Sequence, residues 1–442
     1  MRAKSRRQKP LLHSGVLRVV RVRCEAGRVP RFEPFRALRY DTGKVPGLDA
    51  VTAPPYDVLS DADLDRLEHR DPHNIVHVDV PRDRDGDSRY EIAGTLLREW
   101  ITDGVMVLDP EPSFTLYRQQ FADAAGRVRD IVGVVGALEV VDEGGGGVLP
   151  HERVTHKAST DRLDLTRATR ANMSPIWGLS LAEGLTELLR EPGEVVGVVV
   201  VDQVTHSVER VVDPARVRAI STKVQSDDVL IADGHHRYGI ARVFRDEERV
   251  STGSDDTGAE LTLAFVNELV ADQLSVEAIH RVYRDIDRGD LVEALAVGFE
   301  MNSAAGPVTA ATLDGMIERG ALCLVDAGGN GTWLTPRSGF FDDVRALDGA
   351  WLEHVLAGTS ASVTYQHGVA EVTEMVANDA SVAAAVLIRP VSIAEIQRTA
   401  REGLLMPPKS TFFTPKLRTG LVVRPIDGPT TATSATADSP TA

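Results

Sequence analysis

The chain has little of what marks membrane proteins, nucleic-acid-binding proteins or disulfide-stabilised scaffolds. Its 442 residues include two cysteines, Cys24 and Cys323, which cannot form a disulfide framework and fit the reducing cytoplasm. No apolar run approaches the roughly 18 residues that a membrane-spanning helix needs. The net charge of −16 gives no broad positive field to attract a nucleic acid. We therefore expect a cytoplasmic protein with neither a membrane nor a nucleic acid as its partner.

Aromatic residues are also sparse, at 5% of the chain, whereas 43% of the residues are apolar. The core must therefore be mainly aliphatic, and the chain is long enough for one large core or two to three smaller ones. The GxSxG turn of serine hydrolases, the GxGxxG fingerprint of dinucleotide-binding folds and the phosphate loop GxxxxGK[ST] are all absent. These absences exclude the commonest catalytic and nucleotide-binding signatures.

The two ends of the chain differ in composition from the rest. Residues 1–31 carry ten Lys and Arg residues against one acid, and their apolar positions are interrupted too often for a secretory signal. We predict that 1–30 is a basic, disordered extension outside the fold, and leave open whether it belongs to the native protein; a nucleic-acid-binding arm is the alternative. The Thr/Ala/Ser/Pro-rich end, 426–442, is predicted to be a disordered tail.

Between these ends, strand and helix patterns alternate. Strands are predicted at 74–80, 113–121, 128–141, 229–232, 261–267, 321–325, 331–335 and 385–389, with a strand pair at 195–212 that turns near Thr205 to Ser207. Helices are predicted at 88–102, 157–171, 214–224, 235–248, 289–299, 347–357 and 392–402. The mixture, with hairpin-like pairs, indicates a mixed α/β (α+β) fold. Because Gly144 to Gly147 form no regular element, we place a boundary or a mobile loop there and predict regions 31–143, 148–288 and 289–425.

The segment with the clearest chemistry is the DGHHR box: Asp233, Gly234, His235, His236 and Arg237. A buried strand ends at the Asp-Gly turn, and a helix pattern begins at once. A helix N-terminus presents unpaired N–H groups and a partial positive charge, so it suits an anion. Gly234 allows close approach, the histidines and Arg237 add donors, and Arg237 can grip a phosphate with two hydrogen bonds. The pattern predicts a phosphate site with His236 as a candidate catalytic residue.

Two other interpretations of the box remain open. In the first, Asp233 merely caps the helix and the histidines are surface residues. In the second, the two histidines bind a metal, although adjacent histidines rarely serve one zinc ion and catalytic pairs usually stand four residues apart.

A second cluster of charge follows the glycine run, in the segment 150–157. Glu152 among cations would stay ionised, so it could accept a proton or hold Mg²⁺, and Lys157 could bind phosphate. A solvated helix face is the alternative. The zinc-protease motif HExxH is excluded, because His156 stands one residue too late.

Two proline pairs precede further candidates. Pro54-Pro55 fix an extended segment that aims Asp57, which could act as a base or metal ligand, or else cap a helix starting near Ser60. Pro407-Pro408 precede Lys409, which could reach a phosphate as a point charge, or else lie in a packed loop.

These segments together resemble the bacterial and archaeal family known as domain of unknown function 1015. The stretches that carry the resemblance are APPYDVLS (53–60), PHNIVHVDVPRD (72–83), PHERVTHKASTDRL (150–163), ATRANMSPI (168–176), IADGHHRY (231–238) and MPPKSTFFTPKLRTGLV (406–422). They run in order from about residue 31 to 425, so the resemblance covers nearly the whole chain.

The DGHHR box by itself resembles the phosphate-binding box of the ParB/sulfiredoxin superfamily, in particular its free-serine kinases. The resemblance implies a ParB/sulfiredoxin-like nucleotide-binding core, elaborated by further mixed-sheet regions, in which the five box residues bind donor phosphates. Sulfiredoxin has a catalytic cysteine in its box; this chain has none there, which speaks against sulfinic-acid reduction.

The leading hypothesis is a phosphotransferase that moves a phosphoryl group from ATP, ADP or pyrophosphate to a small-molecule hydroxyl, by resemblance that of free L-serine. Glu152 or Asp57 would take the hydroxyl proton, and Mg²⁺ would bridge the phosphates. A phosphohydrolase or nucleotidase that uses the same pocket, and a nucleotide sensor without catalysis, remain alternatives. The sequence predicts no oligomeric state.

Overall fold

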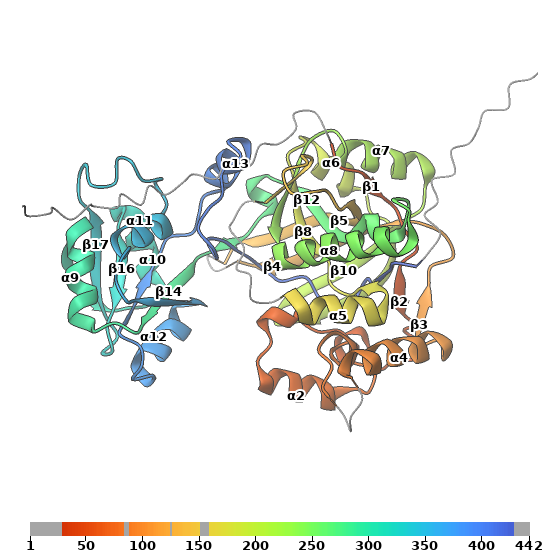
Figure 1. Cartoon of the computed structure of the whole chain (residues 1–442), viewed down its shortest axis with the longest axis horizontal. Helices are drawn as coiled ribbons and strands as arrows, with labels where there is room; N and C mark the ends of the chain where they lie inside the picture. The colour runs from red at the N-terminus through yellow and green to blue at the C-terminus, as the bar shows by residue number, and fades with distance from the viewer. Residues whose placement is uncertain (1–28, 84–87, 124–125, 151–158, 428–442) are drawn as a thin grey trace, which may run out of the picture.

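The computed structural model describes residues 29–83, 88–123, 126–150 and 159–427. These residues form two bodies, each built around one β-sheet, that lie side by side in Figure 1. The larger body contains a nine-stranded sheet, and the smaller one, on the left of Figure 1, a six-stranded sheet. The basic extension and the tail fall almost wholly outside the described residues, so their predicted disorder stays a prediction.

The large sheet is mixed. Its strands follow the order β6-β11-β8-β12-β5-β4-β10-β9, with β1 also paired to β5. The bounds are β1 Phe32–Glu33, β4 Phe114–Ala122, β5 Val128–Glu139, β6 Val148–Pro150, β8 Ile176–Ser180, β9 Glu194–Val201, β10 Val204–Val211, β11 Val229–Asp233 and β12 Leu261–Glu268. β11 runs parallel to β6 but antiparallel to β8, and β8 runs parallel to β12. This arrangement confirms the predicted mixed α/β fold.

Side chains from both faces of the large sheet are buried. In the central strand β12, Leu263 and Phe265 pack into one core cluster, while Ala264 and Val266 pack into another. Helices also contribute side chains to the cluster that contains Ala264 and Val266, and the C-terminal segment contributes to the cluster that contains Leu263 and Phe265. The helices of this body are α1 Leu48–Val51, α2 Asp61–Arg70, α3 Val76–Asp79, α4 Arg89–Thr102, α5 Ser159–Thr169, α6 Leu185–Arg190, α7 Pro214–Val224 and α8 His235–Thr252. A strand buried on both faces explains the unbroken apolar run of β12.

The smaller body repeats this scheme with its own core. Its sheet order is β15-β17-β16-β19-β14-β18. The strands are β14 Ile279–Arg284, β15 Phe299–Pro307, β16 Leu322–Val325, β17 Asn330–Pro336, β18 Ser362–His367 and β19 Ala384–Leu387; the helices are α9 Arg288–Gly298, α10 Ala311–Arg319, α11 Asp348–Val355 and α12 Val369–Asn378. In β16, Leu322 and Leu324 pack with α9 and α11, whereas Cys323 and Val325 pack with α10 and α12.

After β19 the chain returns to the large body. Helix α13 (Ile393–Arg401) places Ile396 in the core of the large sheet. The segment that follows then crosses that body: β20 (Phe412–Phe413) pairs with β13 (Val276–Glu277), Thr419 pairs with Ala53, and β21 (Arg424–Pro425) pairs with β7 (Ala171–Asn172). Residues 412–425 therefore tie together elements from distant parts of the sequence.

Three sequence-based expectations need correction. Residues 74–80 were expected to form a strand but contain the helical turn α3, because Val76 and Val78 are both buried and Asn74 starts the turn through its side chain. The turn of the β9–β10 hairpin lies at Asp202 and Gln203, which both have positive φ, rather than near residue 206. The glycine run separates β5 from β6 but does not separate two sheets, since both strands belong to the large one.

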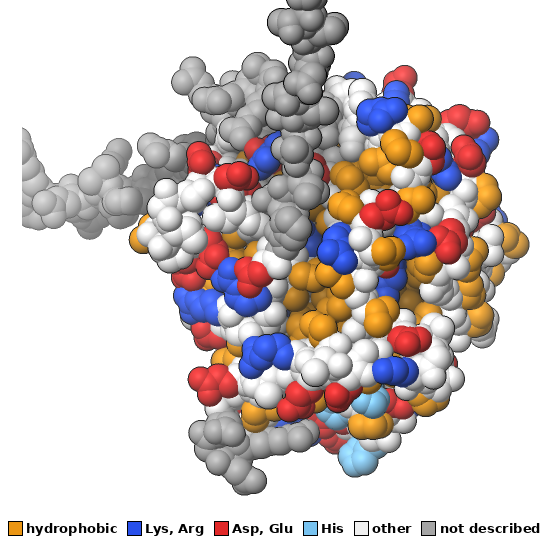
Figure 2. Space-filling model, turned by 90° about the vertical axis from the view of Figure 1, so that its right-hand side faces the viewer, with side chains coloured by type: hydrophobic (Ala, Val, Ile, Leu, Met, Phe, Trp, Pro, Cys, Tyr) orange, Lys and Arg blue, Asp and Glu red, His pale blue; other side chains and the backbone are white. Residues whose placement is uncertain are grey.

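Most other predicted elements are found within a few residues of their expected bounds. A shorter pairing of β2 (Leu38–Tyr40) with β3 (Met106–Leu108) joins the N-terminal helices to the large body. Figure 2 shows hydrophobic side chains gathered in the middle of the end face of the large body, with charged side chains around them. Among the described residues, no helix is long and apolar enough to cross a membrane.

Candidate functional site

The turn between β11 and α8 is built around Gly234. Its φ of 87° lies in the left-handed region, which favours glycine. A Cβ atom at this position would also meet Ile176 Cγ2 at 3.1 Å and the Arg237 guanidinium at 3.2 Å. Gly234 is the N-cap of the 18-residue helix α8, and no side chain caps that end. The first turn of α8 therefore keeps the partial positive charge that suits an anion.

Asp233 does not cap α8, so the capping interpretation is wrong. Its Oδ2 atom lies 2.6 Å from Arg237 Nη2, and its Oδ1 atom lies 2.7 Å from Lys416 Nζ. Burial alone would raise the Asp233 pKa, but the charges of Lys416 and Arg237 hold it below its usual value. Asp233 is thus an ionised carboxylate that accepts from one cation on each oxygen.

Arg237 is held on two sides. Besides Asp233, its Nη1 atom donates to the carbonyl oxygen of Pro175, in the turn before β8. The remaining donor, Nε, is buried and has no hydrogen-bond partner among the described residues. Each terminal nitrogen carries two N–H groups, so Arg237 keeps further donors that could meet a phosphate beside these two contacts.

The residues that follow Gly234 have different roles. His235 is buried, whereas His236 is half-buried. The Tyr238 hydroxyl donates to the Glu139 carbonyl at 2.9 Å and accepts from the Val141 amide at 2.8 Å. Tyr238 therefore anchors α8 to the end of β5.

The proline pair at 54–55 brings Asp57 and Tyr56 toward the box. Both belong to the short 3-10 helix Tyr56–Val58, and Asp57 is exposed. Helix α2 is capped by Ser60 through a capping box, so Asp57 does not serve that purpose. Burial alone would lower the pKa of Arg237, but the Asp233 and Asp57 carboxylates raise it. The Asp57 charge is therefore close enough to act on the box.

Asp79 and Arg162 are site residues that the sequence-based reasoning did not select. Arg162, on α5, donates from Nη1 to the Asp79 carbonyl at 2.6 Å and to Asp79 Oδ1 at 3.3 Å, and lies 4.4 Å from the ring centre of Tyr56. Asp79 is 4% exposed. Burial raises the pKa of its carboxyl, and the Arg162 charge offsets this only in part. The apolar-polar alternation of 74–80 gave no signal that Asp79 points into the interior.

The remaining predicted residues lie elsewhere. Lys409 is exposed, and its carbonyl oxygen accepts from Arg281 Nη1 at 2.9 Å; no contact with the box is found among the described residues. The lysine that reaches the box from the same stretch is Lys416. Glu152 and Lys157 lie outside the described residues, so their predicted roles stay predictions.

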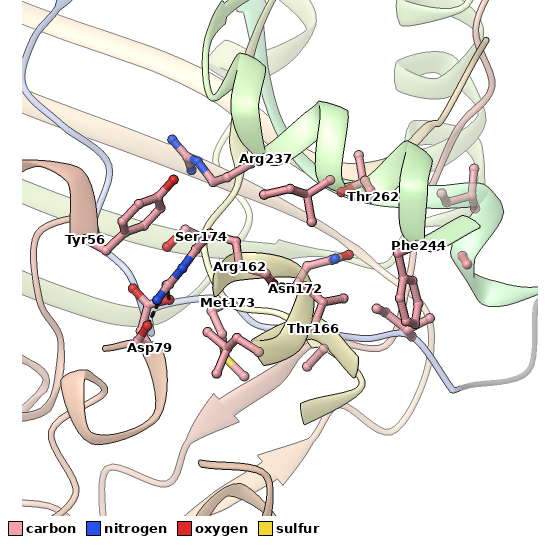
Figure 3. Close-up of a pocket in the computed structure, with 17 residues that line it drawn as sticks. Tyr56, Asp79, Arg162, Thr166, Asn172, Met173, Ser174, Arg237, Phe244 and Thr262 are labelled. Atoms are coloured by element: carbon pink, nitrogen blue, oxygen red, sulfur yellow. Dashed lines mark hydrogen bonds and ion pairs between the residues drawn. The ribbon is translucent and has the colours of Figure 1, made fainter. Parts of the chain in front are cut away.

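A cavity of about 60 Å³ lies next to the box, between α5 and α8. Figure 3 shows its charged side chains, Asp79, Arg162 and Arg237, at one end with Tyr56 and Ser174, and Phe244 at the other; the polar side chains of Asn172, Thr166 and Thr262 lie between them. A nucleotide needs a cavity of several hundred Å³, so this one cannot enclose a nucleotide.

No group of three His, Cys, Asp or Glu side chains is placed to bind a metal ion in the part of the chain that the structure describes. Any Mg²⁺ would therefore take most of its ligands from phosphate oxygens, which is how this ion commonly binds with nucleotides. Asp57 is an exposed carboxylate whose charge raises the pKa of Arg237, so it is a candidate to complete such a site.

Comparison with known proteins identifies the family. The family model described as "Protein of unknown function (DUF1015)" matches residues 32–350, so the chain belongs to this family, as the sequence motifs indicated. No curated protein matches the chain.

Solved structures show more distant likenesses. A mutant free serine kinase in complex with ADP is 13% identical, with a TM-score of 0.34, over 60% of this chain and 83% of that one. SbnI with a C-terminal truncation, from Staphylococcus aureus, is 12% identical, with a TM-score of 0.35, over 66% and 87%. A conserved hypothetical protein from Pyrococcus furiosus is 12% identical, with a TM-score of 0.33, over 60% and 86%. At these values, the likenesses assign no function to this chain.

Proposed function

We propose that this member of the DUF1015 family is a small-molecule phosphotransferase, which takes a phosphoryl group from ATP, ADP or pyrophosphate and transfers it to the hydroxyl of free L-serine. The observation that carries the proposal is the start of α8. There a helix N-terminus, begun by Gly234, meets two partly buried cations, Arg237 and Lys416. The choice of serine rests on the similarity of the DGHHR box to that of free-serine kinases.

The proposed reaction forms one bond and breaks one bond. The serine hydroxyl oxygen bonds to the terminal phosphorus of the donor, and the bond from that phosphorus to the bridging oxygen breaks. The products are phosphoserine and the shortened donor, and the hydroxyl proton passes to a base. Such a transfer is catalysed mainly by positioning and by stabilising charge on the phosphoryl oxygens.

The side chains divide into two groups in this proposal. His235, His236, Arg237 and the α8 N-terminus hold the donor phosphates. Asp57, exposed next to the box, is the candidate base among the described residues, with Glu152 as the second candidate from the sequence. When bound, Mg²⁺ would neutralise phosphate charge.

Asp233 controls the charge of the empty site in this proposal. It neutralises Arg237 and Lys416 while no phosphate is bound, so an arriving phosphate competes with it for both cations. Two buried cations without an anion would be costly, which explains why an acidic residue begins a phosphate box.

The direct test is to incubate the purified full chain with L-serine, Mg²⁺ and each donor in turn, and to measure phosphoserine. The His236→Ala variant should lose at least about tenfold in rate, the usual size for a lost contact to a charged group. His69→Ala is the matched control, because His69 is exposed on α2, far along the chain from the box. Phosphate release without serine, or donor binding without turnover, would contradict the proposal.

A further inference from the structure

The cavity between α5 and α8 has two unlike ends. Hydrocarbon from Met173, Ile240 and Phe244 lines most of it, and charged side chains close the end next to the box. Because Arg237 lines the cavity and also belongs to the box, whatever fills the cavity lies beside the proposed phosphate site.

The charged end offers an acceptor that is not fully used. Asp79 is 4% exposed, and among the described residues its carboxylate accepts one hydrogen bond, at Oδ1 from Arg162 at a long 3.3 Å. The better bond of that Arg162 nitrogen goes to the Asp79 backbone carbonyl, at 2.6 Å. A buried carboxylate normally has partners on both oxygens, so a cationic hydrogen-bond donor in the cavity would complete its shell.

The same end offers an unused donor. Arg237 Nε is buried without a hydrogen-bond partner among the described residues, although the other two nitrogens of the guanidinium are engaged. An anionic acceptor in the cavity would satisfy it. Since one unfilled acceptor and one unfilled donor of opposite charge line one small space, the complementary ligand carries both charges.

The volume sets the size of that ligand. About 60 Å³ corresponds to roughly four to six water-sized probe volumes, so the cavity suits only a small organic molecule. The hydrocarbon lining favours a ligand with a short carbon skeleton over a cluster of ions. A peptide or a sugar phosphate is too large.

We infer that this cavity is the acceptor site and takes a small α-amino acid, with its ammonium on Asp79 and its carboxylate on Arg237. That the bound amino acid accepts a phosphoryl group rests on the proposed function, because the cavity lies next to the proposed phosphate site. The binding of the amino acid itself rests on the cavity alone.

Calorimetric titration of the full chain, with and without ADP, tests which functional groups of a ligand the cavity recognises. L-Serine and L-alanine should both bind, because both carry the two charges. Ethanolamine, which lacks the carboxylate, and 3-hydroxypropionate, which lacks the ammonium, should bind about 10- to 100-fold more weakly. If 3-hydroxypropionate binds as well as serine, the cavity does not recognise the ammonium and the inference is wrong. If no amino acid binds under either condition, the inference is also wrong and the cavity holds water only.

Two variants assign the binding to this cavity. Asp79→Asn should weaken L-serine binding about 10- to 100-fold. Asp164→Asn is its matched control, since Asp164 also pairs with an arginine but on the outer side of α5, away from the cavity lining. Should Asp79→Asn fail to fold, Ala241→Leu fills the cavity from α8 without touching its charges and should abolish serine binding. Serine binding unchanged in the folded variants would overturn the inference.

The two proposals can fail separately. Serine binding that depends on Asp79, without phosphoserine from any donor, would support the cavity and contradict the phosphotransferase. Phosphoserine formation with an unchanged KM for serine in Asp79→Asn would support the phosphotransferase and contradict the cavity.

Discussion

The two bodies of the chain share a way of building a core but differ in where they hold charge. Strands β12 and β16 both send alternate side chains into two apolar clusters. In the large body, the largely buried pairs Arg162–Asp79 and Arg237–Asp233 lie together beside one cavity. In the smaller body the Arg389–Asp348 pair is also largely buried, whereas the Arg337–Glu300 pair is exposed. Burying charge costs free energy, so its concentration next to α8 favours a chemical role for that region over a purely structural one.

The difference also bears on what each body contributes. The box and the cavity are built from elements of the large body, including residues 412–425, which return to it after the smaller sheet is complete. The smaller body supplies none of the residues that line the cavity. We therefore expect its stability and the binding of ligands at the box to be separable.

The strongest test of this separation is Phe299→Ala. Phe299 is fully buried at the start of β15, and its truncation should destabilise the smaller body by about 4 kcal/mol. Hydrogen–deuterium exchange should show faster exchange in β14 to β19. Pyrophosphate binding to the box, measured by titration, should stay within about twofold of wild type, since additivity is expected for distant sites. Loss of that binding would show that the bodies are coupled.

The next largest effect is expected for Asp233→Asn. Removing one partner of a buried ion pair leaves Arg237 and Lys416 without their anion, which should lower the free energy of unfolding by about 3 kcal/mol. Glu300→Gln is the comparison in the smaller body, because that pair is exposed and 3.9 Å long; it should change stability by less than about 1 kcal/mol. Urea denaturation measures both, and equal effects would remove the contrast between the bodies.

How far the sequence could predict the site depends on how local its interactions are. The turn at Gly234, the end of β11 and the start of α8 follow from neighbouring residues, and the structure has them where expected. Lys416 could not be found this way, because it meets Asp233 only after residues 412–425 cross the large sheet. The choice of Lys409 from the same stretch followed the proline pair, but what places Lys416 is that non-local path.

Asp79 shows a second limit of prediction from the sequence. Here the difficulty is the periodicity of the apolar residues, and not the separation of contacting residues along the chain. Apolar and polar residues alternate in 74–80 as they do in a half-buried strand, and in such a strand Asp79 would face the solvent. When the same residues form a single helical turn, the side chains of Val76, Val78 and Asp79 are all buried. A run this short fits both periods, and the elements packed against it, such as α2 and α4, decide between them.

A smaller difference in stability is expected between alanine substitutions at two glycines, Gly234 in the turn and Gly239 in helix α8. Gly234→Ala imposes a left-handed conformation on alanine and crowds Ile176, so it should destabilise the chain by about 1–2 kcal/mol and weaken pyrophosphate binding. Gly239→Ala is the control: no atom would touch its Cβ, and alanine favours the helix by about 0.5–1 kcal/mol. A stable Gly234→Ala protein would show that the turn does not depend on glycine.

The smallest effect is expected in the pH dependence of the two carboxylates beside the box. Burial raises the Asp79 pKa, so the ionised carboxylate costs stability that is recovered as pH falls through its folded pKa. Wild-type protein should therefore gain stability relative to Asp79→Asn between about pH 7 and about pH 4. Lys416 and Arg237, acting against burial, lower the Asp233 pKa, so its contribution is complete above the unfolded pKa near 3.9 and is lost only below it. The difference in the free energy of unfolding between wild type and Asp233→Asn should stay constant over the same pH range. Urea denaturation at each pH measures both gaps, and the same trend in the two variants would mean that the two carboxylates do not differ in their electrostatic surroundings.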